Sequence, residues 1–317
     1  MSIYIKYANQ IAFCFDRTTT LFALLATVIT SACLNSSTAE DRRGMSLNVR
    51  ALSDENVFDY AETSRCNKTS FTQIVKYPDL EILTIGTASH GDKIADVDAK
   101  ILQSLHRLKK LSISSHQLGN EGFSYLCQIK SLEHLSVSFS ELDDEGLAHI
   151  QGLRNLTELT LDCAIDGKGL AHLAKLPKLS KLDLYVYPNI DLTFLPASLQ
   201  LSSLRVLNDV LEQAEMEVIA KSSQLEHFSF EGKLKTASPQ LQLLTQLPRL
   251  SFLAIDSPQC DDNCVDSINC PALAVVALKG TFSDKAITRF LARHKSLTDL
   301  CIESKNITVE SLKKNLL

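Results

Sequence analysis

The sequence predicts an α/β protein built as a curved solenoid, with a parallel sheet on its concave face and helices or turns on its convex face. Three observations support this prediction. A short leucine pattern recurs about ten times, hydrophobic residues make up 45% of the 317 residues, and aromatic residues only 6%, with no tryptophan. One aliphatic residue type therefore fills the core again and again, as a stacked repeat requires.

The recurring pattern is L-x-x-L-x-L with conservative replacements. Its ten copies begin at Leu80, Leu108, Leu132, Leu156, Leu179, Leu201, Leu225, Leu250, Leu273 and Leu297. Successive copies start 22 to 28 residues apart, which matches the length of one short strand with its return segment. A single copy would carry no information because leucine is common, but ten near-equal intervals do.

Each copy predicts a short strand, because its fourth and sixth positions lie on the same face of an extended chain. The second half of each unit returns on the outside as a helix or turn, for example 144–150 and 167–173. Pro196 and Pro239 indicate that some return segments start as turns or short helices. Strands pack about 4.8 Å apart and helices about 8–10 Å apart, so the array must curve around its sheet.

Two runs resemble a known family. LDDEGLAHIQGLRNLTELTL (142–161) and IDGKGLAHLAKLPKLSKLDL (165–184) resemble bacterial leucine-rich repeats of the D-x-G-L type and are similar to their cysteine-containing subclass. The resemblance covers roughly residues 71–317 and implies a leucine-rich-repeat solenoid. One feature departs from many such repeats. Their ninth position carries an asparagine ladder, whereas the first five copies here hold Ala88, His116, Ser140, Ala164 and Tyr187.

The open ends of a solenoid need polar caps. We expect residues 46–79 to form the N-terminal cap, residues 80–305 the repeats, and residues 306–317 a helical C-terminal cap. The apolar residues expected to cover the first repeat are Val49, Leu52, Val57, Phe58 and Phe71.

The N-terminus indicates a targeting signal. No charged residue occurs from Thr18 to Ala39, and the dense apolar part, Leu21 to Ile29, is followed by small residues. This stretch is shorter than the roughly 20 apolar residues of a membrane-spanning helix. It fits the apolar region of a signal peptide spanning residues 1–32.

The segment 29–33, Ile-Thr-Ser-Ala-Cys, resembles the lipobox of bacterial lipoproteins, although Thr30 stands where leucine is commonest. The resemblance implies acylation of Cys33, a lipidated tether over residues 33–45, and, from Leu34, location at the outer membrane. Two alternatives stay open. In the first, Cys33 is incidental in an ordinary signal peptide. In the second, the segment is an uncleaved anchor or does not direct export.

Sequence motifs give no indication of catalysis. The phosphate-binding, dinucleotide-binding, zinc-protease and serine-hydrolase signatures are all missing from the sequence, and the repeats occupy most of the chain. We expect no enzyme activity and no cofactor. The net charge of −5 and the pI of about 5.9 argue against nucleic acid as the partner.

The histidines and cysteines were considered as metal ligands. His149 and His172 occupy equivalent repeat positions, so we interpret them as part of the repeat rather than as a metal pair. Nine cysteines are present, and the closest group is Cys260, Cys264 and Cys270. Its spacing suits a zinc site poorly. A disulfide within this group and buried free thiols are the two main alternatives.

Side chains that alternate with the core positions should face the concave side of the sheet. Around the middle of the array these are charged or aromatic. The predicted contact residues, called the concave patch below, are Lys110, His134, Glu158, Asp162, Lys181, Asp183, Tyr185 and Arg205. Tyrosine and arginine often anchor interfaces. The alternative is that these are ordinary solvated sheet positions.

The sequence thus predicts an interaction scaffold that binds a protein or a glycan on its concave face, exported and anchored in the cell envelope by lipid. A secreted or translocated effector that binds host machinery is the main alternative. An enzyme with a site on the concave face is the weakest of the three hypotheses.

Overall fold

The computed structural model describes residues 2–7, 10–14, 47–51, 58–63, 74, 76–85, 95–186 and 189–307. Its strands form one sheet in the order β2-β1-β14-β13-β12-β11-β10-β9-β8-β7-β6-β5-β4-β3. The strands are β1 (Ser2–Tyr7), β2 (Gln10–Cys14), β3 (Leu47–Ala51), β4 (Phe58–Thr63), β5 (Ile82–Ile85), β6 (Lys110–Ser114), β7 (His134–Ser140), β8 (Glu158–Cys163), β9 (Lys181–Tyr185), β10 (Ser203–Leu211), β11 (His227–Leu234), β12 (Phe252–Asp256), β13 (Val275–Gly280) and β14 (Asp299–Ser304).

The ten strands from β5 to β14 are the ten predicted from the leucine pattern. Each pairs in parallel with the next along the chain. The return segments lie on the other side, again as predicted, and form short helices. These are α3 (Asp96–Ala99), η1 (Lys100–Ser104), α4 (Asn120–Leu126), α5 (Asp144–Leu147), η2 (Ala148–Gly152), η3 (Lys168–Lys175), η4 (Leu192–Phe194), α6 (Gln213–Ile219), α7 (Ser238–Gln242), η5 (Leu243–Gln246), α8 (Asp262–Ser267) and α9 (Asp284–Arg293).

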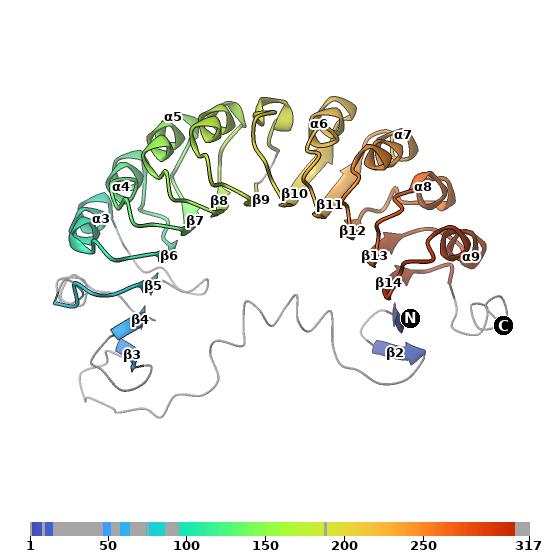
Figure 1. The fold of residues 1–317 in the computed structure, drawn as a ribbon, viewed down its shortest axis with the longest axis horizontal. Helices are drawn as coiled ribbons and strands as arrows, with labels where there is room; N and C mark the ends of the chain where they lie inside the picture. The colour runs from blue at the N-terminus through green and yellow to red at the C-terminus, as the bar shows by residue number, and fades with distance from the viewer. Residues whose placement is uncertain are drawn as a thin grey trace.

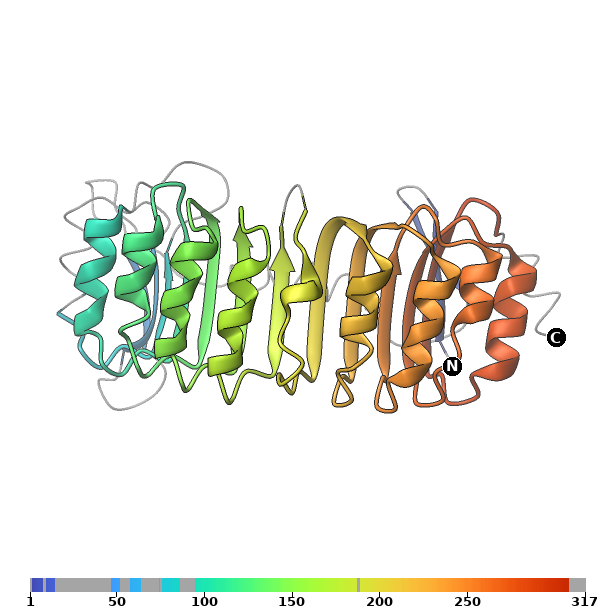
Figure 2. The same ribbon diagram turned by 90° about the horizontal axis from the view of Figure 1, so that it is seen from above.

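The molecule is an arc with the sheet inside and the helices outside (Figure 1). Viewed from above, the helices stand side by side along the convex face (Figure 2). The curvature follows from the packing distances, because helices need about twice the spacing of strands. The α/β solenoid predicted from the sequence is therefore confirmed, with its concave face formed by parallel strands.

Both ends of the array carry strands from the first 63 residues. β4 pairs in parallel with β5, and β3 pairs antiparallel with β4. At the other end, β1 pairs in parallel with β14, and β2 pairs antiparallel with β1. The predicted N-terminal cap thus contributes two strands to the sheet. Leu21 to Ile29, Cys33 and residues 308–317 of the predicted C-terminal cap lie outside the described residues.

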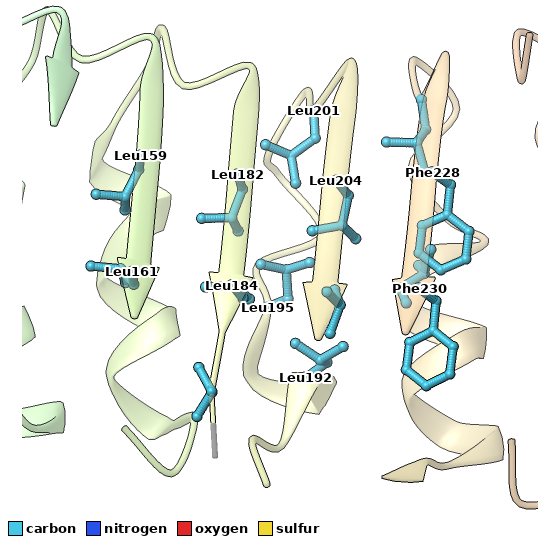
Figure 3. Packing of buried hydrophobic residues seen from close by; sticks show 14 of the residues in the cluster. Leu159, Leu161, Leu182, Leu184, Leu192, Leu195, Leu201, Leu204, Phe228 and Phe230 are labelled. Carbon is cyan, nitrogen blue, oxygen red and sulfur yellow. The ribbon is translucent and has the colours of Figure 1, made fainter. Parts of the chain in front are cut away.

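The core consists of two rows of side chains that run across the sheet in register. Figure 3 shows the middle of these rows, where Leu182, Leu204 and Phe228 lie side by side on adjacent strands. Every member is at most 2% exposed. Row one is Leu83, Leu111, Leu135, Leu159, Leu182, Leu204, Phe228, Leu253, Val276 and Leu300; row two is Ile85, Ile113, Val137, Leu161, Leu184, Val206, Phe230, Ile255, Leu278 and Ile302. Burying each such side chain contributes roughly 1.5–3 kcal/mol, so the rows dominate the stability of the fold.

Polar side chains at the helix starts replace the asparagine ladder missing from the ninth position. Asn120 Oδ1 accepts a hydrogen bond from the backbone N–H of Asp143 in the next repeat at 3.1 Å, and Asp144 Oδ2 accepts one from Asp166 at 2.7 Å. Asp96 and Asp262 accept equivalent bonds from the repeats that follow them. These side chains accept hydrogen bonds from the backbone N–H groups between repeats. In the repeats of Asn120 and Asp144, the acceptor residue lies four positions after the usual ladder position.

This ladder explains the glycine of the D-x-G-L motif. A Cβ atom on Gly146 would lie 2.0 Å from Asn120 Oδ1, and one on Gly169 would lie 2.8 Å from Asp144 Oδ1. Both distances are shorter than a Cβ atom tolerates, so glycine leaves the space that the ladder side chain of the preceding repeat occupies.

Candidate functional site

The concave patch predicted from the sequence lies across β6 to β10, near the middle of the arc. In the sheet register, Lys110, His134, Glu158 and Lys181 stand opposite one another on four adjacent strands. Asp183 lies opposite Arg205 one row further along. The register of parallel repeats thus brings together residues that are about 23 positions apart in sequence.

Glu158 is the centre of the Lys110–His134–Glu158–Lys181 row of the concave patch. Its carboxylate pairs with His134 Nδ1 at 2.7 Å on one side and with Lys181 Nζ at 2.5 Å on the other. Partial burial favours the neutral acid, but the hydrogen bonds from Lys181 and His134 outweigh it and hold the pKa of Glu158 below its usual value. Glu158 therefore stays ionised, and its contacts link the three side chains of His134, Glu158 and Lys181 into one set.

Arg205 is the centre of a second group in the concave patch, together with Asp183 and Tyr185. Its Nη1 donates a hydrogen bond to Tyr185 Oη at 2.8 Å and lies 3.9 Å from an Asp183 carboxylate oxygen. Burial raises the pKa of Asp183, although the nearby guanidinium of Arg205 opposes the rise. An arginine held by a tyrosine and a carboxylate loses little side-chain freedom when a partner binds.

Two patch residues are not paired. The side chains of Asp162 and Lys110 make no hydrogen bond or ion pair within residues 95–186 and the other described segments. Burial alone raises the pKa of Asp162 above its usual value. Asp162 is therefore a half-buried carboxylate without a compensating cation in the described structure.

A cavity of about 280 Å³ opens beside Asp162, at the edge formed by the carboxyl ends of β7 and β8; we call it the edge cavity. It is lined by His116, Ser140, Glu141, Asp162, Cys163, Ala164 and Tyr185. Glu141 and Ser140 are not among the contact residues predicted from the sequence. Small residues at the ninth repeat position, such as Ser140 and Ala164, were the available signal, because they leave room where the ladder asparagine usually stands.

A larger hollow of about 520 Å³ lies at the opposite edge of the sheet, where the parallel strands begin. It is lined by Lys130, Gln151, Gly152, Arg154 and Asn155. Lys130 Nζ already donates to the Cys127 carbonyl oxygen at 3.0 Å, and Asn155 bonds to the Lys130 carbonyl. Its polar groups serve the turns between repeats, so this hollow lies apart from the concave patch.

The cysteine group 260–270 contains free thiols in the structure. Cys260, Cys264 and Cys270 are fully buried in the core, an arrangement that matches the second of the two alternatives, buried free thiols, rather than a disulfide. Cys264 Sγ donates to the Gln259 carbonyl and Cys270 Sγ to the Leu244 carbonyl, each at 3.3 Å. These thiols fill the core beneath α8 as small apolar groups.

No group of three or more histidine, cysteine, aspartate or glutamate side chains within the described residues could hold a metal ion. His149 is exposed on the convex side and His172 half-exposed. Within the same part of the chain, no helix has the length and apolar character needed to cross a membrane.

No protein-family description and no curated protein matches the chain. Among solved structures, the chain is similar to an internalin from Listeria monocytogenes, with 17% identity, a TM-score of 0.49, and 81% of this chain and 85% of that chain covered. A leucine-rich-repeat protein of Leptospira interrogans follows at 16% identity, TM-score 0.42, and coverage of 80% and 75%. The plant peptide hormone receptor RGFR1 in complex with RGF2 is similar at 17% identity, TM-score 0.41, and coverage of 73% and 37%.

The ten parallel strands in register, the buried leucine rows and the outer helices together make this chain a leucine-rich-repeat solenoid.

Proposed function

We propose that the protein is an interaction scaffold that holds a protein partner on the concave face of its solenoid. The observation that carries this proposal is the Arg205–Tyr185–Asp183 cluster at the middle of that face. The three side chains are held in place yet still partly exposed: the side chains of Arg205 and Asp183 are 36% and 30% accessible. Pre-organised arginine and tyrosine in a concave surface are what interface anchors require.

The arrangement supports binding better than catalysis. Glu158 is ionised and held between the Lys181 ammonium and the His134 imidazole, and Arg205 is fixed by hydrogen bonding. Neither group is poised to transfer a proton or attack a substrate. A surface of fixed opposite charges instead favours a partner with complementary charges and determines its orientation.

The binding proposal is tested with two arginine variants. The immobilised full-length chain is used to capture partners from a cell-envelope extract, and affinity for the captured protein is then measured. Arg205→Ala should weaken binding about 30-fold, the effect of losing an anchor residue worth about 2 kcal/mol. The matched control is Arg289→Ala on the convex face, where Arg289 pairs with Asp266 at 2.5 Å. Equal effects of the two variants would contradict binding on the concave face.

We also propose that the chain is exported and anchored in a bacterial cell envelope through acylated Cys33. The lipobox resemblance at 29–33 and the polar segment 34–45 support this proposal. Processing before Cys33 would remove β1 and β2 and leave the edge of β14 unpaired. The proposal therefore also predicts that the β14 end of the sheet is the open end in the mature protein.

Labelled palmitate should be incorporated into the protein in bacterial cells, and incorporation should be lost in Cys33→Ala but kept in the control Cys66→Ala. Mass spectrometry of the same material should show loss of residues 1–32. A wild-type protein that incorporates no label would refute the anchor without affecting the binding proposal.

A further inference from the structure

One wall of the edge cavity is acidic, and its lining among the described residues contains no lysine or arginine. The Asp162 side chain is half-buried and makes no hydrogen bond or ion pair with described residues, and the exposed Glu141 likewise has no cationic partner there. Two cations of the concave patch are already engaged: Arg205 with Tyr185 and Asp183, and Lys181 with Glu158. A half-buried carboxylate without a partner is costly and is stabilised by a cation that enters the cavity.

A second, independent feature points to a ligand. Ser140 lines the cavity at the end of β7 and is only 9% exposed, and its Oγ atom has no hydrogen-bond partner within the described structure. The neighbouring Cys163 thiol is close enough for the Ser140 hydroxyl to oppose the rise in the Cys163 pKa that burial causes, but the two side chains do not meet hydrogen-bond geometry. Because buried hydroxyl groups are nearly always hydrogen-bonded, an orphaned one beside a cavity indicates a missing donor or acceptor.

The size of the cavity restricts what can enter it. At about 280 Å³ it is smaller than most pockets for drug-sized ligands or cofactors. It suits one extended side chain that comes from the concave face. Tyr185 lines the cavity and also belongs to the concave patch through its bond to Arg205, so a partner lying on the patch can reach the cavity.

We propose that the edge cavity receives an arginine side chain of the protein partner. A guanidinium group has five N–H donors in a planar fork. It can therefore bond to both oxygens of Asp162 and also donate to Ser140 Oγ, while the Tyr185 ring provides an aromatic surface for the cation. The ammonium of lysine is a point charge without this geometry. This inference deepens the proposed function and rests on it for the identity of the ligand as part of a protein.

The test uses a small probe and the full chain. N-acetyl-arginine methylamide is titrated into isotope-labelled protein at low ionic strength, and backbone NMR signals of residues 140–142 and 162–164 are followed. We expect saturable shifts in these residues. The neutral isostere N-acetyl-citrulline methylamide should bind at least about tenfold more weakly, since hydrogen bonds to charged groups are the stronger ones. Equal binding of citrulline would overturn the proposal, and equal binding of the lysine analogue would overturn the guanidinium assignment.

Two cavity variants and one control complete the test. Asp162→Asn should weaken the arginine probe about tenfold or more. Ser140→Ala should weaken it a few-fold while leaving the unfolding midpoint unchanged or slightly raised, because it removes an unsatisfied hydroxyl. The control Glu145→Gln removes an exposed charge outside the cavity and should change nothing. Unaltered probe binding by folded Asp162→Asn protein would refute the proposal.

The outcomes separate this inference from the proposed function. Partner binding that depends on Arg205 but not on Asp162 would refute only the arginine cavity. Probe binding in the edge cavity without any dependence of partner binding on Arg205 would refute only the concave binding mode.

Discussion

Replacing Phe228 with alanine is expected to lower the free energy of unfolding by about 3–5 kcal/mol, the cost of truncating a fully buried aromatic side chain. Phe228 is 0% exposed and lies beside Leu204 of β10 in the first core row (Figure 3), with Leu253 of β12 opposite it on the other side. In a solenoid each repeat is stabilised mainly by its neighbours, so a cavity here weakens two interfaces at once. The loss would therefore be concentrated in β10 to β12.

The matched control is Phe252→Ala on the adjacent strand. Phe252 faces the concave side, is half-exposed, and packs against His227 with ring centroids 5.7 Å apart. Its truncation should cost less than about 1.5 kcal/mol, because less apolar area returns to water. Urea unfolding gives the free energies, and hydrogen exchange locates the weakened strands. Similar losses for the two variants would contradict the assignment of which residue faces the core.

Replacing Asp144 with alanine is expected to cost about 2–4 kcal/mol, a large effect for a residue outside the leucine rows. The Asp144 carboxylate accepts hydrogen bonds from the backbone N–H groups of Asp166 at 2.7 Å, Gly167 at 3.2 Å and Gly169. Two of these donors are partly buried, and an unsatisfied buried donor costs about 1–3 kcal/mol. The variant leaves them without the acceptor that links α5 to η3.

Asp144→Asn keeps one carbonyl oxygen as an acceptor and should show an intermediate loss. Glu145→Gln, a charge change at the next and exposed position, should leave the free energy of unfolding within about 0.5 kcal/mol of the wild type. Thermal or urea unfolding of the three variants measures the order. An alanine variant as stable as the glutamine control would show that water replaces the carboxylate at these donors.

The leucine pattern determined the strands because its physical basis is local and repeated. Leu159 and Leu161 must share one face of a strand, and the same holds in every copy. A strand that is ambiguous in one repeat can therefore be assigned from its neighbours. The number and order of the strands from β5 to β14 followed directly. The concave placement of Glu158 and Arg205 followed from the same alternation, since they lie between core positions.

Several features of the site could not be read from the pattern. The pairing of Glu158 with Lys181 and of Arg205 with Tyr185 depends on side-chain conformations across strands. The free thiols of the group 260–270 depend on how deeply α8 packs. The pairing of β1 with β14 joins residues almost 300 positions apart, and no local signal specifies such a contact.

The sequence by itself determined the repeat, its register and the face on which each side chain lies, because these depend on the period of the chain. Only the tertiary structure decided where the interrepeat hydrogen bonds form and where a cavity opens. Moving the ladder from the ninth position to Asn120 and Asp144 leaves His116 and Ser140 at the vacated positions, and both line the edge cavity. The edge cavity beside Asp162 arises from the stacking of neighbouring repeats, which no single repeat encodes.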